Sequence, residues 1–116
     1  MELSKNELFI AVREIISQSR LKVFRAANSA LLESYWQIGK LIVEDEQQGK
    51  LRAEYGAATL KTLSNQLTLE FGKGFDESNL RNIRGFYKSF PIRDAVRHEL
   101  SWTHYRLHAV SQSLNL

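Results

Sequence analysis

The sequence predicts an all-α fold, a helical bundle that contains a helix-turn-helix-like unit and has little or no β-structure. The first observation is composition: one proline and six glycines among 116 residues are too few for the many turns of an all-β domain. The second is periodicity, because apolar residues recur three and four positions apart over most of the chain. With 43% apolar and 25% charged residues, residues 1–116 are expected to form a single domain.

Residues 1–48 predict one long helix or a pair of helices, with a break at residues 17–20 if there are two. Tyr35 and Trp36 are expected in the core, since they lie beside an apolar stripe at helical spacing. Gly39 costs about 1 kcal/mol within a helix, so we expect another helix to approach closely there. Gly49 is expected to end the region. Two successive stripes carry the prediction: Leu8, Val12, Ile15 and Ile16, then Val23, Ala27, Ala30, Leu31, Ile38, Leu41 and Ile42.

Residues 57–90 predict the helix-turn-helix-like unit. Gly72 and Gly74 should stop the first helix sharply, and Asp76 is a good N-cap for a second helix over residues 77–90. Phe86 is expected at the edge of the second helix's apolar stripe. The two stripes are Leu60, Leu63, Leu67 and Phe71, then Leu80, Ile83, Tyr87 and Phe90.

A closing helix is predicted over residues 101–113, capped by Ser101. Residues 91–100 contain neither an Asn-Gly nor an Asp-Gly turn, so a full β-hairpin wing is not expected. Because the closing helix is barely three turns long when the chain stops, we expect the domain to be cut from a longer protein.

The charge is unevenly distributed. Residues 1–48 carry a net charge of −1, and residues 49–116 carry +4. Between Asn79 and Arg97 the net charge is again +4. A local positive excess marks a surface that can face a polyanion, although charge alone fits a solvated helix face equally well.

The polar face of the second helix predicts DNA binding. Arg, Lys, Asn and Gln are the residues that read base edges best, and a helix fits the major groove of duplex DNA. Hydroxyls and cations contact phosphates. The predicted DNA-binding residues are Lys73, Ser78, Asn79, Arg81, Asn82, Arg84, Lys88 and Arg93. A plain solvated helix face is the alternative interpretation of the same residues.

Other functions find little support. His104 and His108 have metal-ligand spacing, but no cysteine and no acid of the same helix completes a site, so no metal and no cofactor are expected. We interpret the acidic run 44–46 as a solvated helix end. No nucleotide-binding loop or nuclease motif is visible, so this chain is expected to be non-catalytic. The lack of cysteine, signal peptide and membrane-spanning run favours the cytoplasm and excludes a membrane partner.

The sequence resembles the amino-terminal domain of the YhcG family from about Ile10 to Leu107. The resemblance is carried by AANSALL at 26–32, YWQIGKLI at 35–42, QQG at 47–49, YGA at 55–57 and LSWTHY at 100–105, with Leu63-Ser64, Leu67, Gly74-Phe75, Asn79-Leu80 and Phe86-Tyr87 between them. It implies an all-helical, helix-turn-helix or winged-helix-like module that binds DNA and precedes a bacterial nuclease domain of the PD-(D/E)XK type.

Two functions are therefore expected. The first is a non-catalytic DNA-binding module of a nuclease, positioned on duplex DNA through residues 77–90. The alternative is a protein-interaction module, in which residues 1–48 form a homodimer or dock the C-terminal nuclease domain of the parent protein.

Overall fold

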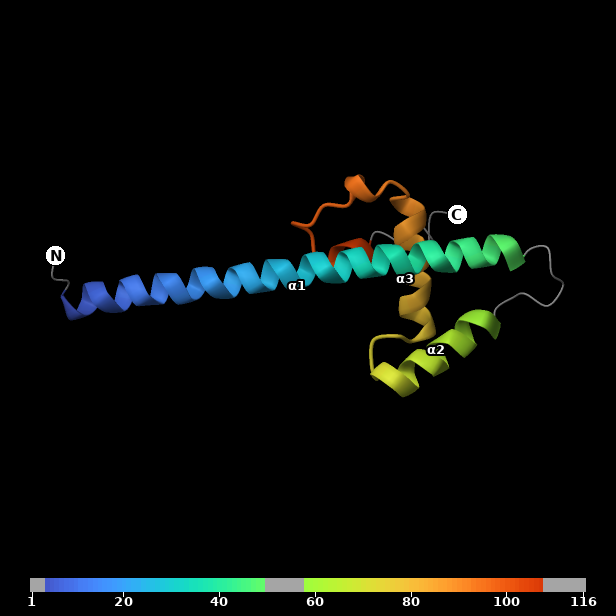
Figure 1. Ribbon diagram of the computed structural model, residues 1–116, viewed down its shortest axis with the longest axis horizontal. Coiled ribbons are helices and arrows are strands. Elements are labelled where there is room, and N and C mark those ends of the chain that lie inside the picture. Colours follow the sequence, from blue (N-terminus) through green and yellow to red (C-terminus); the bar gives the residue numbers. More distant parts are fainter. Residues whose placement is uncertain (1–3, 50–57, 108–116) are drawn as a thin grey trace.

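The computed structural model describes residues 4–49 and 58–107 and is elongated, with extents of 75 × 31 × 22 Å (Figure 1). The described elements are α1 (Lys5–Gly49), α2 (Ala58–Phe71), α3 (Glu77–Ser89) and a short 3-10 helix, η1 (Arg93–Ala95). A further helical segment begins at Trp102 and extends to at least Leu107, the last described residue. No residue of 4–49 or 58–107 is in a strand, which confirms the all-α prediction.

α1 is one uninterrupted helix of 45 residues, so the break expected at residues 17–20 is absent. Its first turn is capped by Ser4, whose Oγ accepts a hydrogen bond from the backbone N–H of Glu7 (3.1 Å). Serine in a helix interior costs only about half a kcal/mol, and Gln18 Nε2 donates to Glu14 Oε1 one turn earlier (3.2 Å). Residues 17–20 are polar but include neither glycine nor proline, and polar residues alone do not interrupt the helix here.

α3 crosses α1 at Gly39, as the glycine predicted (Figure 1). A Cβ at Gly39 would lie 2.5 Å from the carbonyl oxygen of Ile83 and 2.8 Å from Cβ of Tyr87. The missing side chain thus lets the two helix backbones approach, and this crossing is the centre of the fold.

Two apolar clusters flank the crossing. One contains Leu32, Phe86, Val96 and Tyr105, and the other contains Ile42, Leu60, Leu80 and Ile83. Trp102 packs against both clusters, as does Tyr35, and Trp36 packs against the first. Phe86, predicted at the edge of the stripe, is only 1% exposed, so the buried face of α3 extends to this edge. The C-terminal segment covers the side of α3 that the sequence pattern left open.

The turn between α2 and α3 follows the predicted chemistry. Gly72 and Gly74 have φ values of +82° and +110°, which favour glycine over residues with a side chain. Asp76 accepts a hydrogen bond from the backbone N–H of Asn79 (3.0 Å) and caps α3. Ser64 Oγ in α2 donates to the carbonyl of Phe75 (2.7 Å) and fixes the turn against α2.

Residues 91–100 form η1 and turns, with no strand, so the winged variant that the family resemblance implied is not built by these residues. The segment is fastened to α1, because the Asn28 side chain donates to the carbonyls of His98 and Leu100, both at 2.9 Å. Of the predicted closing helix, residues 108–113 lie outside the described residues.

Candidate nucleic-acid interface

The outer face of α3, opposite its crossing with α1, carries Ser78, Arg81 and Lys88, all exposed to solvent. Arg81 lies 3.7 Å from Glu77 one turn earlier, but 52% of its side chain stays accessible. An exposed ion pair of this kind contributes little and is readily exchanged for another anion. These three predicted residues are therefore free to meet a ligand.

Arg84 is arranged differently. Its Nη1 lies 2.8 Å from Glu46 Oε1 of α1, and the two side chains are only 29% and 22% exposed. The ion pair joins residues 38 positions apart and ties α3 to α1. Glu46 is thus a structural partner, and the interpretation of run 44–46 as a solvated helix end is wrong at this residue. The sequence pattern could not show this pair, because it depends on how the two helices cross.

Arg93 of η1 also faces a carboxylate of α1. Its Nη2 lies 2.6 Å from Glu33 Oε1, and both side chains remain about half exposed. Of the predicted DNA-binding arginines, Arg84 is thus held against α1 in a partly buried ion pair, and Arg93 lies outside α3, on η1, in an exposed one.

Asn79 has both ends of its amide engaged within the chain. Its Nδ2 donates to the carbonyl of Gly74 (2.7 Å), and its Oδ1 accepts from the indole N–H of Trp102 (3.2 Å). The side chain joins the turn to the C-terminal segment, so it positions α3, and its amide nitrogen and oxygen are each engaged within the chain.

A polar hollow of about 590 Å³ lies beside the N-terminal end of α3. Lys73, Ser78 and Asn82, all predicted from the sequence, line it together with Thr68 and Arg106. The rest of the lining includes the carboxylate of Asp76, which caps α3, so two cations face one acid among hydroxyl and amide groups, a surface that can accept a phosphate or another anion. Arg106 was missed because it lies far along the chain from α3, and only its place after the LSWTHY run could have drawn attention to it.

The hydroxyl of Tyr105 is buried under the C-terminal segment. It donates to the carbonyl of Arg97 (2.9 Å) and accepts from the backbone N–H of the same residue (2.5 Å). Burial raises the pKa of Tyr105 above 10.0, while the hydrogen bond from Arg97 opposes this shift. The Tyr105 side chain therefore anchors the C-terminal segment, which includes Arg106, to the core.

Neither a metal cluster nor a membrane-spanning helix is present in the described part of the chain. Residues 4–49 and 58–107 bring no three His, Asp or Glu side chains together in a metal-binding arrangement. His104 Nδ1 lies 2.9 Å from Ser101 Oγ at the start of the last helical segment, and His108 lies outside the described residues. No helix in the described ranges has the length and apolarity to cross a bilayer.

Fold and surface together define a helical module in which a helix-turn-helix-like unit is braced by one long helix. The chain belongs to the DUF1016 N-terminal domain family, whose model matches residues 11–114. It is also similar to a protein of Escherichia coli (strain K12) named "Putative nuclease YhcG", with 41% identity over 76 residues. The match covers 66% of this chain and 20% of that protein, so the chain spans only about one fifth of the relative's length. No solved structure is significantly similar to the chain.

Proposed function

We propose that this chain is the DNA-binding module of a nuclease and that it meets duplex DNA with the outer face of α3. The observation that carries the proposal is the placement of Ser78, Arg81 and Lys88 on the exposed side of a helix whose other side is fixed by α1 and the core. A rigidly held helix with an exposed basic face is what major-groove binding requires.

The residues divide into two roles. Ser78, Arg81 and Asn82 lie where an inserted helix meets base edges, and Lys73, Lys88 and Arg106 flank them as phosphate contacts. Residues 73–107 carry seven Lys and Arg against four acids, a net charge of +3, which supports a polyanionic ligand. Arg84 and Asn79 act as positioning residues. Arg93 lies on η1, outside α3, and is at the edge of the proposed DNA-binding surface.

The cleavage chemistry is proposed to lie outside this chain. The relative from Escherichia coli is named as a nuclease, and four fifths of its length is not matched here. A nuclease domain C-terminal to this module would be brought to its substrate by the DNA contacts of α3.

Binding of a labelled duplex, followed by fluorescence anisotropy at several salt concentrations, tests the proposal. The wild-type chain should bind with an affinity that falls as salt rises, by about 0.9 log units per log unit of salt for each phosphate contact. The double variant Arg81→Ala/Lys88→Ala should bind more weakly, by roughly 1–3 kcal/mol for a base-reading arginine, with a smaller salt slope. Single-stranded and branched DNA measured alongside identify the preferred form.

Lys61→Ala is the matched control. Lys61 is an exposed cation, but it belongs to α2 and does not line the polar hollow. It should leave the affinity close to that of the wild type. Equal affinities for wild type and the Arg81/Lys88 double variant would remove α3 from the interface.

A second function, protein association, is supported by a separate observation. The first half of α1 exposes large apolar side chains, among them Ile15 (67%) and Phe24 (65%), and exposed apolar patches mark protein-binding surfaces. We propose that this half of α1 binds a protein, either a second copy or the C-terminal part of the parent protein. Sedimentation of the Ile16→Glu variant tests whether association depends on this surface.

A further inference from the structure

The first half of α1, residues 5–27, extends away from the rest of the domain (Figure 1). Among the described residues, Asn28 is the first side chain of α1 that is hydrogen-bonded to a distant segment. The radius of gyration is 20.1 Å, against about 13 Å for a compact domain of this length. The extension therefore has the geometry of an arm that lacks a packing partner within these residues.

The arm leaves large apolar side chains exposed to solvent. The chain has 9181 Å² of accessible surface, whereas a compact protein of its mass has about 6,500 Å². The difference of roughly 2,700 Å² belongs to the elongated chain as a whole, and the exposed arm contributes to it. Phe9, Val12, Ile16 and Val23 are between 45% and 70% exposed.

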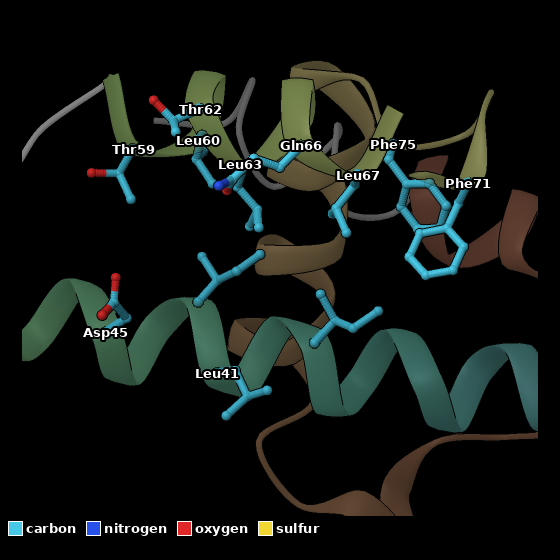
Figure 2. Close-up of a pocket in the computed structure, with 12 residues that line it drawn as sticks. Leu41, Asp45, Thr59, Leu60, Thr62, Leu63, Gln66, Leu67, Phe71 and Phe75 are labelled. Atoms are coloured by element: carbon cyan, nitrogen blue, oxygen red, sulfur yellow. The ribbon is translucent and has the colours of Figure 1, made fainter. Parts of the chain in front are cut away.

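An apolar groove of about 810 Å³ lies between the second half of α1 and α2 (Figure 2). Leu60, Leu63 and Leu67 point from α2 toward α1, and Phe71 and Phe75 stand side by side at one end, with ring centroids 6.1 Å apart. Leu41 is 66% exposed at the rim on α1. The groove is therefore wide, apolar and open along α1.

The apolar stripe of the arm reaches the groove at Leu41. Residues three, four or seven positions apart share a helix face. A single stripe at this spacing runs the length of the helix through Val12, Ile16, Val23, Ala27, Ser34 and Leu41. This face thus carries the exposed apolar side chains of the arm and, at Leu41, the rim of the groove, while the other α1 residues that line the groove, Ile38, Ile42 and Asp45, lie to one side of the stripe.

The charges of α1 favour an antiparallel partner of the same sequence. Residues 5–25 carry five Lys and Arg against two acids, a net charge of +3, and residues 33–46 carry one Lys against four acids, a net charge of −3. Ion pairs with Arg84 and Arg93 already offset part of the negative half. Antiparallel α1 helices still place opposite charges side by side, whereas parallel helices would place +3 against +3.

We propose that two copies of this chain form an antiparallel dimer in which the first half of each α1 fills the groove between α1 and α2 of the other copy. This inference rests on the proposal that the arm is a protein-binding surface, and it names the partner. The contact is self-complementary, as a two-fold interface requires. If Val12 lies near Leu41 of the second copy, the two-fold axis passes beside Ala26 and Ala27, whose small side chains let the helices approach.

Sedimentation velocity of the chain at several concentrations is the first test. The wild type should be a dimer that dissociates on dilution, and Val12→Glu/Ile16→Glu should raise its dissociation constant at least tenfold. Leu41→Glu on the groove rim should have a similar effect. Two matched controls should leave the dimer intact: Leu69→Glu, 89% exposed on α2 and outside the groove, and Ile10→Glu, about 160° around α1 from Val12. A wild type that is monomeric at every concentration overturns the proposal.

Cysteine cross-linking tests the arrangement, because the chain has no cysteine of its own. Val12→Cys mixed with Leu41→Cys should give an oxidised heterodimer, and Ala27→Cys alone should cross-link to itself. Self-cross-linking of Val12→Cys would show parallel helices and overturn the antiparallel dimer. If Ile16→Glu dissociates the dimer but the Val12–Leu41 pair does not cross-link, the arm binds protein as proposed and the groove assignment is wrong. Far-ultraviolet circular dichroism shows that each variant keeps its helices.

Discussion

Gly39 of α1 lies directly against Ile83 of α3, so closely that an added Cβ would be 2.5 Å from the Ile83 carbonyl oxygen. The obstacle is backbone, which cannot move aside as the end of a flexible side chain can. Every element of the proposed interface depends on this contact, since it sets how α3 is held across α1.

Replacing Gly39 by alanine should destabilise the domain. The better helix propensity of alanine contributes about 1 kcal/mol, but overpacking against Ile83 and Tyr87 costs typically 1–3 kcal/mol and should outweigh it. Urea unfolding measures the difference. The control Ser17→Ala, on the exposed part of α1, should be neutral or slightly stabilising. A Gly39→Ala protein as stable as wild type would contradict the close crossing.

Truncating the inner face of α3 should be costly. Leu80 and Ile83 are both 0% exposed, so Leu80→Ala and Ile83→Ala should each lower the unfolding free energy by about 2–5 kcal/mol. Leu69→Ala removes a side chain that is 89% exposed and should change the stability by less than about 0.5 kcal/mol. Thermal and urea unfolding of the three variants gives the comparison, and equal stabilities would show that the inner face is wrongly assigned.

The ion pair of Arg84 and Glu46 should stabilise the domain more than it serves DNA binding. In a double-mutant cycle with alanine, the coupling should be about 1 kcal/mol, because the pair is partly buried. The exposed pair of Arg81 and Glu77 should show a coupling of only about 0.3–0.5 kcal/mol. Loss of DNA affinity in Arg84→Ala with no loss of stability would instead make Arg84 a contact residue.

Alkaline pH should weaken the fold through Tyr105. Because burial raises its pKa above 10.0, the folded state holds the phenol proton more tightly than the unfolded state does. The stabilisation is complete below about pH 10 and is lost as the pH rises from there through the raised pKa. Urea unfolding between pH 8 and pH 11 should show this loss.

Tyr105→Phe is the matched variant for that experiment. It should be less stable at pH 8, since its hydrogen bonds to Arg97 are gone, but its stability should fall less steeply above pH 10. Identical slopes in the two proteins would rule out Tyr105 as the group that titrates.

Local signals predicted much of the fold. Asp76, Gly72 and Gly74 located the turn, and the structure begins α3 at Glu77 and ends it at Ser89, one residue short of the expected helix. The apolar period predicted the burial of Leu80 and Ile83. These features depend on neighbouring residues, which a linear pattern contains.

Long-range contacts were missed because they join residues that are far apart in the sequence. Phe86 is buried because Tyr105 and Trp102 pack on it, with ring centroids 4.8 and 5.5 Å away. Arg84 is neutralised by a carboxylate 38 positions away, and Arg106 joins the polar hollow from the end of the described chain. None of these contacts has a spacing that a periodic pattern can show.

The amino-acid sequence by itself determined an all-helical chain, the glycine turn before α3 and a basic, amide-rich second helix, because propensity, capping and periodicity act over a few residues. Only the tertiary structure decided which of those polar groups are free. Crossing of α1 and α3 brings Glu46 to Arg84, and the return of the C-terminal segment brings Trp102 to Asn79, so contacts between distant segments separate structural residues from those left to meet a ligand.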